Sequence, residues 1–272
     1  MSRDNWVRSL GLDVDGSLFV DIDNGIRLYD LCLNDPLPRP VNIHPEELMK
    51  AGNRRLYFRF LKTLKEIESI MFHSAYDGDY QFKKGDIIVD AGARIGTFAA
   101  LISSAVGDDG RIIAIEPEPR SFDCLQKNIK ANQLNNVTAV QKLLWSRTEQ
   151  RDFYLSGNAA SHSAYCDTFY DPTGESIRVE ADTLDNILEG LGIACVNFVK
   201  MDIEGSEIEA LRGMKKTLVS DLHLAIAAYH PIEGTFSYNM IMPQLEQCGF
   251  KAVYVDGLVK ARRQASGFEP AT

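Results

Sequence analysis

The chain has 272 residues, of which 45% are hydrophobic and 25% charged, and its formal net charge at pH 7 is −9. This length suits one large domain, or one domain with a small cap, and the apolar content is enough for a buried core. The acidic balance argues against nucleic acid or an anionic membrane as a partner, because binding to either relies on positive charge.

Residues 1–80 predict a small N-terminal α+β cap. Short apolar runs between residues 10 and 30 are separated by the turn sequences DVDG and DIDNG, a pattern typical of β-hairpins. Residues 46–72 predict a helix, because apolar side chains recur there at steps of three and four residues. These side chains are Leu56, Phe60, Leu64, Ile67 and Met71.

From residue 81 onward, strands alternate with helices. The unbroken apolar run at residues 87–89 predicts a strand that is buried on both faces. Further strands are expected at residues 112–115, 137–144, 197–201 and 222–228. Helices are expected at residues 96–106, 120–132, 207–218 and 239–248. This alternation predicts an α/β fold with a mainly parallel sheet, in a domain that covers residues 81–264.

The C-terminal segment departs from the parallel pattern. In KAVYVDGLVKA, residues 251–261, two apolar strands flank the dipeptide Asp256–Gly257. A two-residue turn of this composition joins antiparallel strands. Residues 265–272 predict a disordered tail.

The sequence VDAGARIGTF, residues 89–98, joins the first strand of this domain to its first helix. Glycines in such a loop let the backbone approach a ligand, and the following helix presents free N–H groups. Glu116 stands at the end of the next strand, where a carboxylate can accept hydrogen bonds from both hydroxyls of a ribose. The order of strand, loop, helix, strand and acid predicts a site for an adenosine-containing ligand.

The same loop favours S-adenosylmethionine over a dinucleotide. The spacing of Gly92 and Gly96 lacks the GxGxxG fingerprint of pyrophosphate binding. Asp90 places a carboxylate where a pyrophosphate would have to approach, whereas the ammonium of S-adenosylmethionine would be attracted to it. Arg94 is compatible with this ligand, because its backbone can line the loop while its side chain points away or meets the ligand's carboxylate.

A second acidic segment is VKMDIEGSEIEALRG, residues 199–213. Its apolar strand ends at Asp202, which we expect beside the same pocket, facing the reactive end of the cofactor. Glu204 and Glu207 open the next helix, where acids suit the helix dipole. We expect Glu207 to point along the helix, so magnesium bound by these three acids is the less favoured interpretation and no metal ligands are predicted.

Five segments carry a resemblance to a known family. They are KKGDIIVDAGARIGTF, IIAIEPEPRSFDCLQKNIKANQLNNV, VEADTLDNIL, VKMDIEGSEIEALRG and IAAYHP, in this order over roughly residues 80–260. Together they resemble the FkbM-type S-adenosylmethionine-dependent methyltransferases. The resemblance implies a Rossmann-like class I methyltransferase fold, with a seven-stranded, mostly parallel sheet and an antiparallel C-terminal strand. It also implies S-adenosyl-L-methionine as the cofactor and O-methylation of a small-molecule or sugar-like hydroxyl.

The predicted cofactor-binding residues lie at these strand ends and loops, with Leu144 over the adenine and Tyr76 closing the pocket. The set comprises Tyr76, Asp90, Gly92, Ala93, Arg94, Gly96, Thr97, Glu116, Pro117, Leu144 and Asp202. Methyl transfer from a sulfonium requires the enzyme mainly to align the acceptor and remove its proton. The candidates for the general base are His230, Asp202 and His162, the last in the polar loop SGNAASHSAY.

Other interpretations are weaker. LDVDGSLF, residues 12–19, resembles the nucleophile loop of haloacid-dehalogenase-like phosphatases, but no buried strand precedes it. DIDNG hints at a calcium loop, yet the twelfth position from Asp21 is Cys32 rather than Glu. A catalytically inactive S-adenosylmethionine-binding protein and, less favoured, a nicotinamide-dependent oxidoreductase remain as alternatives. The sequence indicates neither the acceptor's identity nor the oligomeric state.

The expected location is the cytoplasm, without membrane partners. No run of apolar residues approaches the length of a membrane span, and the opening MSRDNWVRSLGLDVDG is too polar for a signal peptide. The five cysteines are scattered singly with no CxxC pair, which is typical of reduced thiols rather than of disulfides or a zinc site.

Overall fold

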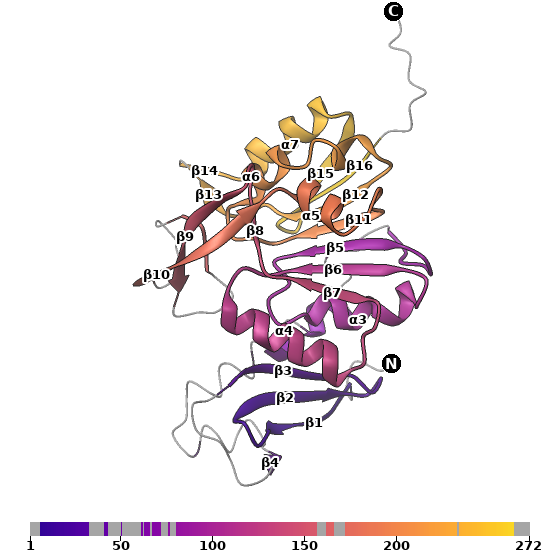
Figure 1. Cartoon of the computed structure of the whole chain (residues 1–272), viewed down its shortest axis with the longest axis vertical. Coiled ribbons are helices and arrows are strands. Elements are labelled where there is room, and N and C mark those ends of the chain that lie inside the picture. The colour runs from indigo at the N-terminus through magenta and orange to yellow at the C-terminus, as the bar shows by residue number, and fades with distance from the viewer. Residues whose placement is uncertain are drawn as a thin grey trace, which may run out of the picture.

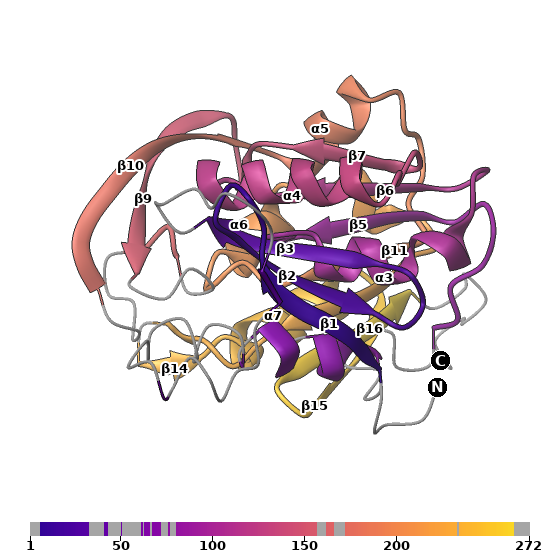
Figure 2. The same ribbon diagram turned by 90° about the horizontal axis from the view of Figure 1, so that it is seen from below.

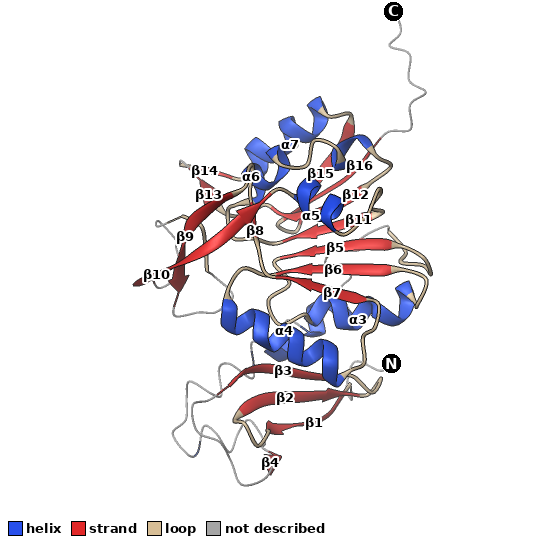
Figure 3. Cartoon of the chain, viewed as in Figure 1, coloured by secondary structure: helices blue, strands red, loops and turns tan. Residues whose placement is uncertain are grey.

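The computed structural model describes residues 6–32, 41–42, 50, 61, 63–65, 67–71, 76, 80–156, 162–165, 172–232 and 234–263. Its largest element is a seven-stranded sheet with helices on both faces, which confirms the predicted α/β class (Figure 1, Figure 3). In spatial order the strands are β15 (Phe250–Val255), β16 (Leu258–Arg263), β12 (His223–Ala227), β11 (Phe198–Met201), β5 (Ile87–Ala91), β6 (Arg111–Ile115) and β7 (Val137–Val140).

The C-terminal strand is antiparallel, as predicted. Strands β12, β11, β5, β6 and β7 run parallel, whereas β16 runs antiparallel to both of its neighbours, β12 and β15. Val255 pairs with Leu258 across the turn, in which Asp256 and Gly257 have φ values of 51° and 84°. The last strand of the chain therefore lies between β12 and β15, one position inside the edge of the sheet.

Both faces of the sheet are covered. The helices on one face are α3 (Thr97–Val106) and α4 (Pro119–Ala131), and those on the other are α5 (Leu184–Gly190), α6 (Glu207–Arg212) and α7 (Tyr238–Gln247). Ile88 of β5 packs with the first group and its neighbour Val89 with the second, and both are fully buried. Successive residues of the strand point to opposite faces of the sheet. Because both faces are buried, every residue of the run is apolar.

A second sheet was not predicted. The segment 137–144, expected as one strand, divides at the polar pair Gln141–Lys142. Strand β7 ends at Val140, and β8 (Leu143–Leu144) leaves the main sheet to pair in parallel with β10 (Pro172–Asp182). Strand β10 also pairs antiparallel with β9 (Glu149–Ser156). A short pair, β13 (Pro231–Ile232) and β14 (Thr235–Phe236), follows β12.

The helix expected over residues 207–218 is shorter than predicted. It ends at Arg212, and a 3₁₀ turn, η1 (Thr217–Val219), follows after a break. Gly213 lies at the break, and a Cβ atom there would lie 2.3 Å from the carbonyl oxygen of Trp145. The chain passes too close to the second sheet at this point to carry a side chain.

The N-terminal strands form a separate antiparallel sheet, as their hairpin turns predicted. Its strands are β1 (Val7–Leu12), β2 (Ser17–Ile22), β3 (Arg27–Cys32) and β4 (Val41–Asn42). Figure 2 shows it lying across α3 and α4. The side-chain amide of Asn128 in α4 accepts a hydrogen bond from Tyr29 N (2.7 Å) and donates to Tyr29 O (2.9 Å), so it pairs with β3 as another strand would.

Part of the predicted helix at residues 46–72 is described. Residues 50, 61, 63–65 and 67–71 are helical where described, and Leu64, Ile67 and Met71 pack with apolar residues of β2 and β3. Leu56, Phe60 and the predicted tail at residues 265–272 lie outside the described residues. Within the described chain, no helix is both long enough and apolar enough to cross a membrane.

Candidate functional site

A cavity of about 500 Å³ opens at the carboxyl ends of β5, β6 and β11, the edge at which parallel α/β sheets bind ligands. The strand ends, the second sheet and the N-terminal region all contribute to its wall. The predicted site residues that line it are Tyr76, Gly92, Ala93, Arg94, Glu116, Pro117, Leu144, His162 and Asp202. The predicted residues outside the lining are Asp90, Gly96, Thr97 and His230.

The two glycines of the loop after β5 are required by close packing. Gly92 has φ 73°, and a Cβ atom there would lie 1.9 Å from the carbonyl oxygen of Asp202. Gly96 has φ 83°, and its Cβ would lie 2.5 Å from Leu125 Cδ1. The first glycine therefore lets the loop touch the end of β11, and the second seats α3 against α4. Thr97 begins α3 with a buried side chain.

Glu116 is the buried acid of the cavity. It is 7% exposed, and its carboxylate accepts hydrogen bonds from the backbone N–H of Arg94 and of Glu118, both at 2.9 Å. Burial raises the pKa of Glu116 to about 7, although these two hydrogen bonds act in the opposite direction. The backbone thus holds a fixed carboxylate beside Pro117 in the cavity wall.

Asp90 does not reach the cavity, because it is paired inside the sheet. Its side chain is fully buried, and Oδ1 lies 3.0 Å from Lys200 Nζ. The β5–β11 register places Lys200 directly beside Asp90, and Lys200 also donates to the carbonyl oxygen of Gly92 at 2.8 Å. Lys200, unlike Asp90, is among the residues that line the cavity.

The side chain of Arg94 extends toward the N-terminal sheet. Its Nη2 atom lies 3.1 Å from Asp30 Oδ2, and Asp30 also accepts a hydrogen bond from Thr63 Oγ1 at 2.7 Å. Its backbone has φ 51°, a left-handed conformation that is uncommon outside glycine. The Arg94 side chain thereby connects the loop after β5 to the N-terminal region, while the Arg94 backbone N–H donates a hydrogen bond to Glu116.

Asp202 and Tyr76 meet at the wall of the cavity. Tyr76 donates from its hydroxyl to Asp202 Oδ2 at 2.8 Å, and its ring packs edge-on against Phe98. The other oxygen of Asp202, Oδ1, has no hydrogen-bond donor among the described residues. This oxygen is itself buried, so the cavity wall holds a carboxylate oxygen whose hydrogen-bonding capacity is unused by the described residues.

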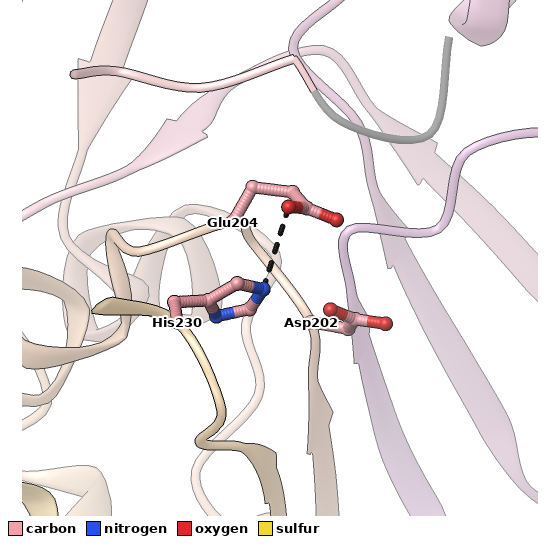
Figure 4. A group of neighbouring side chains, drawn as sticks. All are labelled: Asp202, Glu204 and His230. Atoms are coloured by element: carbon pink, nitrogen blue, oxygen red, sulfur yellow. Dashed lines mark ion pairs between the residues drawn. The ribbon is translucent and has the colours of Figure 1, made fainter. Parts of the chain in front are cut away.

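His230 lies behind the cavity wall, between two glutamates. It is 5% exposed, with Nε2 3.3 Å from Glu204 Oε2 and Nδ1 3.3 Å from Glu207 Oε1 (Figure 4 shows Glu204, His230 and Asp202). Burial alone would lower the pKa of His230, but the carboxylates of Glu207 and Glu204 raise it well above its ordinary value. Both ring nitrogens face glutamate carboxylates, and His230 is not among the residues that line the cavity, so this geometry argues against His230 as a general base.

Glu207 reaches back along its helix toward the residues that precede it. Its side chain is fully buried, and its carboxylate accepts a hydrogen bond from Ile203 N at 3.0 Å. Glu207, the first residue of α6, therefore points toward His230, which follows the end of β12.

His162 lines the cavity from the second sheet. Its Nδ1 accepts a hydrogen bond from Ser156 N at 2.8 Å, and its ring packs edge-on against Phe153. A neutral histidine bound in this way carries its proton on Nε2, so that nitrogen donates rather than accepts. Leu144 and Phe153 supply the apolar part of the same wall.

The sequence reasoning missed Lys200, Phe153 and the N-terminal side chains Lys65 and Ser69, all of which line the cavity. A signal for Lys200 was present, since a single lysine interrupts one buried strand just as Asp90 interrupts its neighbour. Phe153 and His162 could not be placed without the second sheet. The roles predicted for the individual site residues stay predictions.

Comparison with known proteins identifies one matching family model, described as a methyltransferase FkbM domain, over residues 90–252. The chain is 30% identical over 138 residues to the hexuronic acid methyltransferase AglP of Haloferax volcanii, a match that covers 51% of this chain and 54% of that protein. It is 27% identical over 187 residues to methyltransferase sdnD of Sordaria araneosa, covering 58% of this chain and 70% of that protein.

A solved structure of a relative illustrates the shared fold. The crystal structure of methyltransferase FkbM from Methylobacillus flagellatus superposes with a TM-score of 0.52 at 19% identity, covering 72% of this chain and 47% of that one. The chain thus spans about half the length of AglP and of this FkbM protein.

Proposed function

Because the chain belongs to the FkbM family of methyltransferases, whose methyl donor is S-adenosylmethionine, we propose that it methylates a hydroxyl oxygen of a small, sugar-like acceptor. The observation that carries the proposal is the placement of Glu116 and Asp202 in the wall of one cavity, at the ends of β6 and β11. One carboxylate suits a ribose diol and the other suits an acceptor hydroxyl.

The cofactor half of the cavity is assigned as follows. Glu116 accepts hydrogen bonds from the ribose hydroxyls, and Leu144 and Pro117 pack against the adenine. Lys200 lines the cavity where Asp90 does not, and we assign to its ammonium the attraction of the carboxylate of the methionine moiety. Asp90 then acts through Lys200, by holding that ammonium in position.

The reacting half is assigned to Asp202. The acceptor hydroxyl gives its proton to the Asp202 carboxylate while its oxygen bonds to the methyl carbon. The carbon–sulfur bond breaks, and the sulfur keeps the electron pair and becomes the neutral thioether of S-adenosylhomocysteine. Asp202 is preferred to His230 because it lines the cavity and its Oδ1 has no hydrogen-bond donor among the described residues, whereas both ring nitrogens of His230 face glutamates behind the cavity wall.

The acceptor side of the cavity includes the N-terminal region. We assign residues 1–80 as a cap on a methyltransferase domain of residues 81–264, because Lys65, Ser69 and Ile70 join Tyr76 in the lining. The exposed ammonium of Lys65 favours an acceptor that carries a carboxylate. The similarity to a protein named as a hexuronic acid methyltransferase supports the same class.

Methyl transfer tests this proposal directly. The protein is incubated with S-adenosylmethionine labelled in its methyl group and with uronic acids, neutral sugars and phenols, and labelled products are separated. We expect transfer to a uronic acid or a related sugar, and at least a hundredfold lower kcat for Asp202→Asn than for the surface variant Asp108→Asn. Calorimetry with S-adenosylhomocysteine and with NAD provides the second measurement. Tighter binding of NAD, or cofactor binding without transfer to any acceptor, would contradict the proposal.

A further inference from the structure

We propose that Asp202, Glu204 and His230 bind a divalent transition-metal cation at the acceptor end of the cavity. One potential ligand atom of each residue lies within 4.8 Å of the other two, as Figure 4 illustrates. Asp202 and Glu204 follow the end of β11, and His230 follows the end of the neighbouring strand β12. This inference rests on the proposed function, because it assigns the cation to the site where the acceptor would bind.

The orientation of His230 is the first argument. Its Nδ1 faces the fully buried carboxylate of Glu207 at 3.3 Å, which leaves Nε2 directed at Glu204. Histidines that bind metals commonly donate their second nitrogen to a carboxylate, because this fixes the ring and the tautomer. Glu207 occupies the place of that carboxylate.

The second argument is the convergence of buried polar atoms that lack hydrogen bonds. His230 is 5% exposed, and its ring nitrogens make ion-pair contacts of 3.3 Å with Glu204 and Glu207 that lack hydrogen-bond geometry. Asp202 Oδ1 is buried without a hydrogen-bond donor among the described residues. Buried polar groups are normally hydrogen-bonded, and a bound cation is one way to satisfy groups that are not.

The chemistry of the ligand atoms selects the class of cation. Two carboxylates and one imidazole suit Mn²⁺, Fe²⁺ or Zn²⁺ better than an all-oxygen cation such as Ca²⁺. Ligand atoms about 2.1 Å from one cation lie about 3 to 4 Å apart, so the three side chains need only a small inward rotation. Glu204 has the freedom for it, since its side chain is 18% exposed.

The position of the cation would give it a role in the reaction. Asp202 and Glu204 both line the cavity, so the open coordination positions would face the acceptor. An acceptor hydroxyl bound there becomes more acidic and is held in a fixed orientation. Because Asp202 is then engaged as a ligand, the proton of the acceptor hydroxyl would leave to solvent, and the methyl transfer would proceed with the same carbon–oxygen and carbon–sulfur bond changes as above.

Binding of Mn²⁺ alone tests the inference. The purified full chain is stripped of metal with a chelator, and the free Mn²⁺ signal is followed by electron paramagnetic resonance during titration. We expect one tight Mn²⁺ per chain, at least tenfold weaker binding for Glu204→Gln and for His230→Gln, and no change for the control Glu209→Gln in α6. Electron spin echo modulation should show a nitrogen from imidazole in the wild type.

Two results would overturn the inference. One is the absence of saturable Mn²⁺ binding below about 1 mM, and the other is bound Mn²⁺ without nitrogen modulation, a measurement that needs no variant to fold. Calorimetry with S-adenosylhomocysteine separates this inference from the proposed function. Cofactor binding without Mn²⁺ binding removes only the metal site, whereas Mn²⁺ binding without cofactor binding removes the proposed methyl transfer.

Discussion

Lys200 Nζ lies 3.0 Å from Asp90 Oδ1 inside the parallel sheet, with side-chain exposures of 7% and 0%. The two residues are direct neighbours in the β5–β11 register, so each strand carries one charge among apolar residues. A buried charge is tolerated only with its partner, because the loss of one leaves the other uncompensated. The pair therefore couples the stability of the sheet to the shape of the cavity that Lys200 lines.

Replacing Lys200 by Met should lower the free energy of unfolding by about 3 to 5 kcal/mol, because Asp90 is left charged and buried. The double variant Lys200→Met/Asp90→Asn should recover part of this loss. Urea unfolding followed by circular dichroism measures both values. Lys251→Met, on exposed surface of β15, is the control and should change stability by less than about 0.5 kcal/mol. A double variant no more stable than the single one would contradict the coupling.

Substitutions at Gly92 and Gly25 can distinguish the cost of a positive φ angle from the cost of a steric clash. Both have positive φ, 73° and 90°, but a Cβ on Gly92 would lie 1.9 Å from Asp202 O, whereas Gly25 has nothing within 4 Å. Gly25→Ala should cost about 1 to 2 kcal/mol of stability. Gly92→Ala should lower stability by clearly more than Gly25→Ala does, because the loop must move away from the end of β11. It should also abolish the binding of S-adenosylhomocysteine, which calorimetry measures. Equal effects of the two substitutions would show that the contact is unimportant.

The strand ends and their acids could be predicted because their signals are local. The apolar runs before Asp90 and Asp202, the second interrupted only by Lys200, mark strands buried on both faces, and the acid in each case lies within one residue of the strand's end. Parallel strands bring such ends to one edge of the sheet, so Glu116 and Asp202 could be placed at one cavity before the structure was known.

The ionic contacts could not be predicted, because they depend on side-chain direction. The sequence places Glu207 in the first turn of a helix but does not say that its carboxylate turns back to Ile203 N and to His230. The second sheet was missed for another reason. The burial of Glu149–Ser156 alternates only in part, and the partner strand lies distant in sequence, so neither segment carries a clear strand pattern.

Asn128 should anchor the N-terminal sheet. Its fully buried amide bonds both backbone groups of Tyr29 and donates to Ile95 O at 2.7 Å. Asn128→Ala would leave three buried backbone groups without this partner, so we expect a loss of about 2 to 4 kcal/mol in unfolding free energy. Asn239→Ala, which removes an exposed hydrogen bond, is the matched control. Faster hydrogen exchange confined to residues 6–32 would show that the loss acts through β3, whereas unchanged exchange there would contradict this role.

Glu116 should make stability and cofactor binding depend on pH in opposite directions. Burial raises its pKa from 4.5 to about 7, so the folded state favours the protonated carboxyl. Its contribution to stability is complete below the unfolded pKa of 4.5 and is lost as the pH rises through about 7. Between pH 4.5 and 8 the unfolding free energy of the wild type should therefore fall relative to Glu116→Gln, by up to about 3 kcal/mol.

Cofactor binding needs the ionised carboxylate, because only that form accepts hydrogen bonds from both ribose hydroxyls through its two oxygens. The affinity of the wild type for S-adenosylhomocysteine should rise from pH 5.5 to 7.5 and level off above about 7, the pKa of Glu116. Glu116→Gln should bind about 10- to 100-fold more weakly at pH 8, since hydrogen bonds to a charged group contribute about 1.5 to 3 kcal/mol. Calorimetry across this range checks both effects. A variant that keeps the pH dependence of the wild type would place the titrating group elsewhere, and one that keeps its affinity would place the ribose elsewhere.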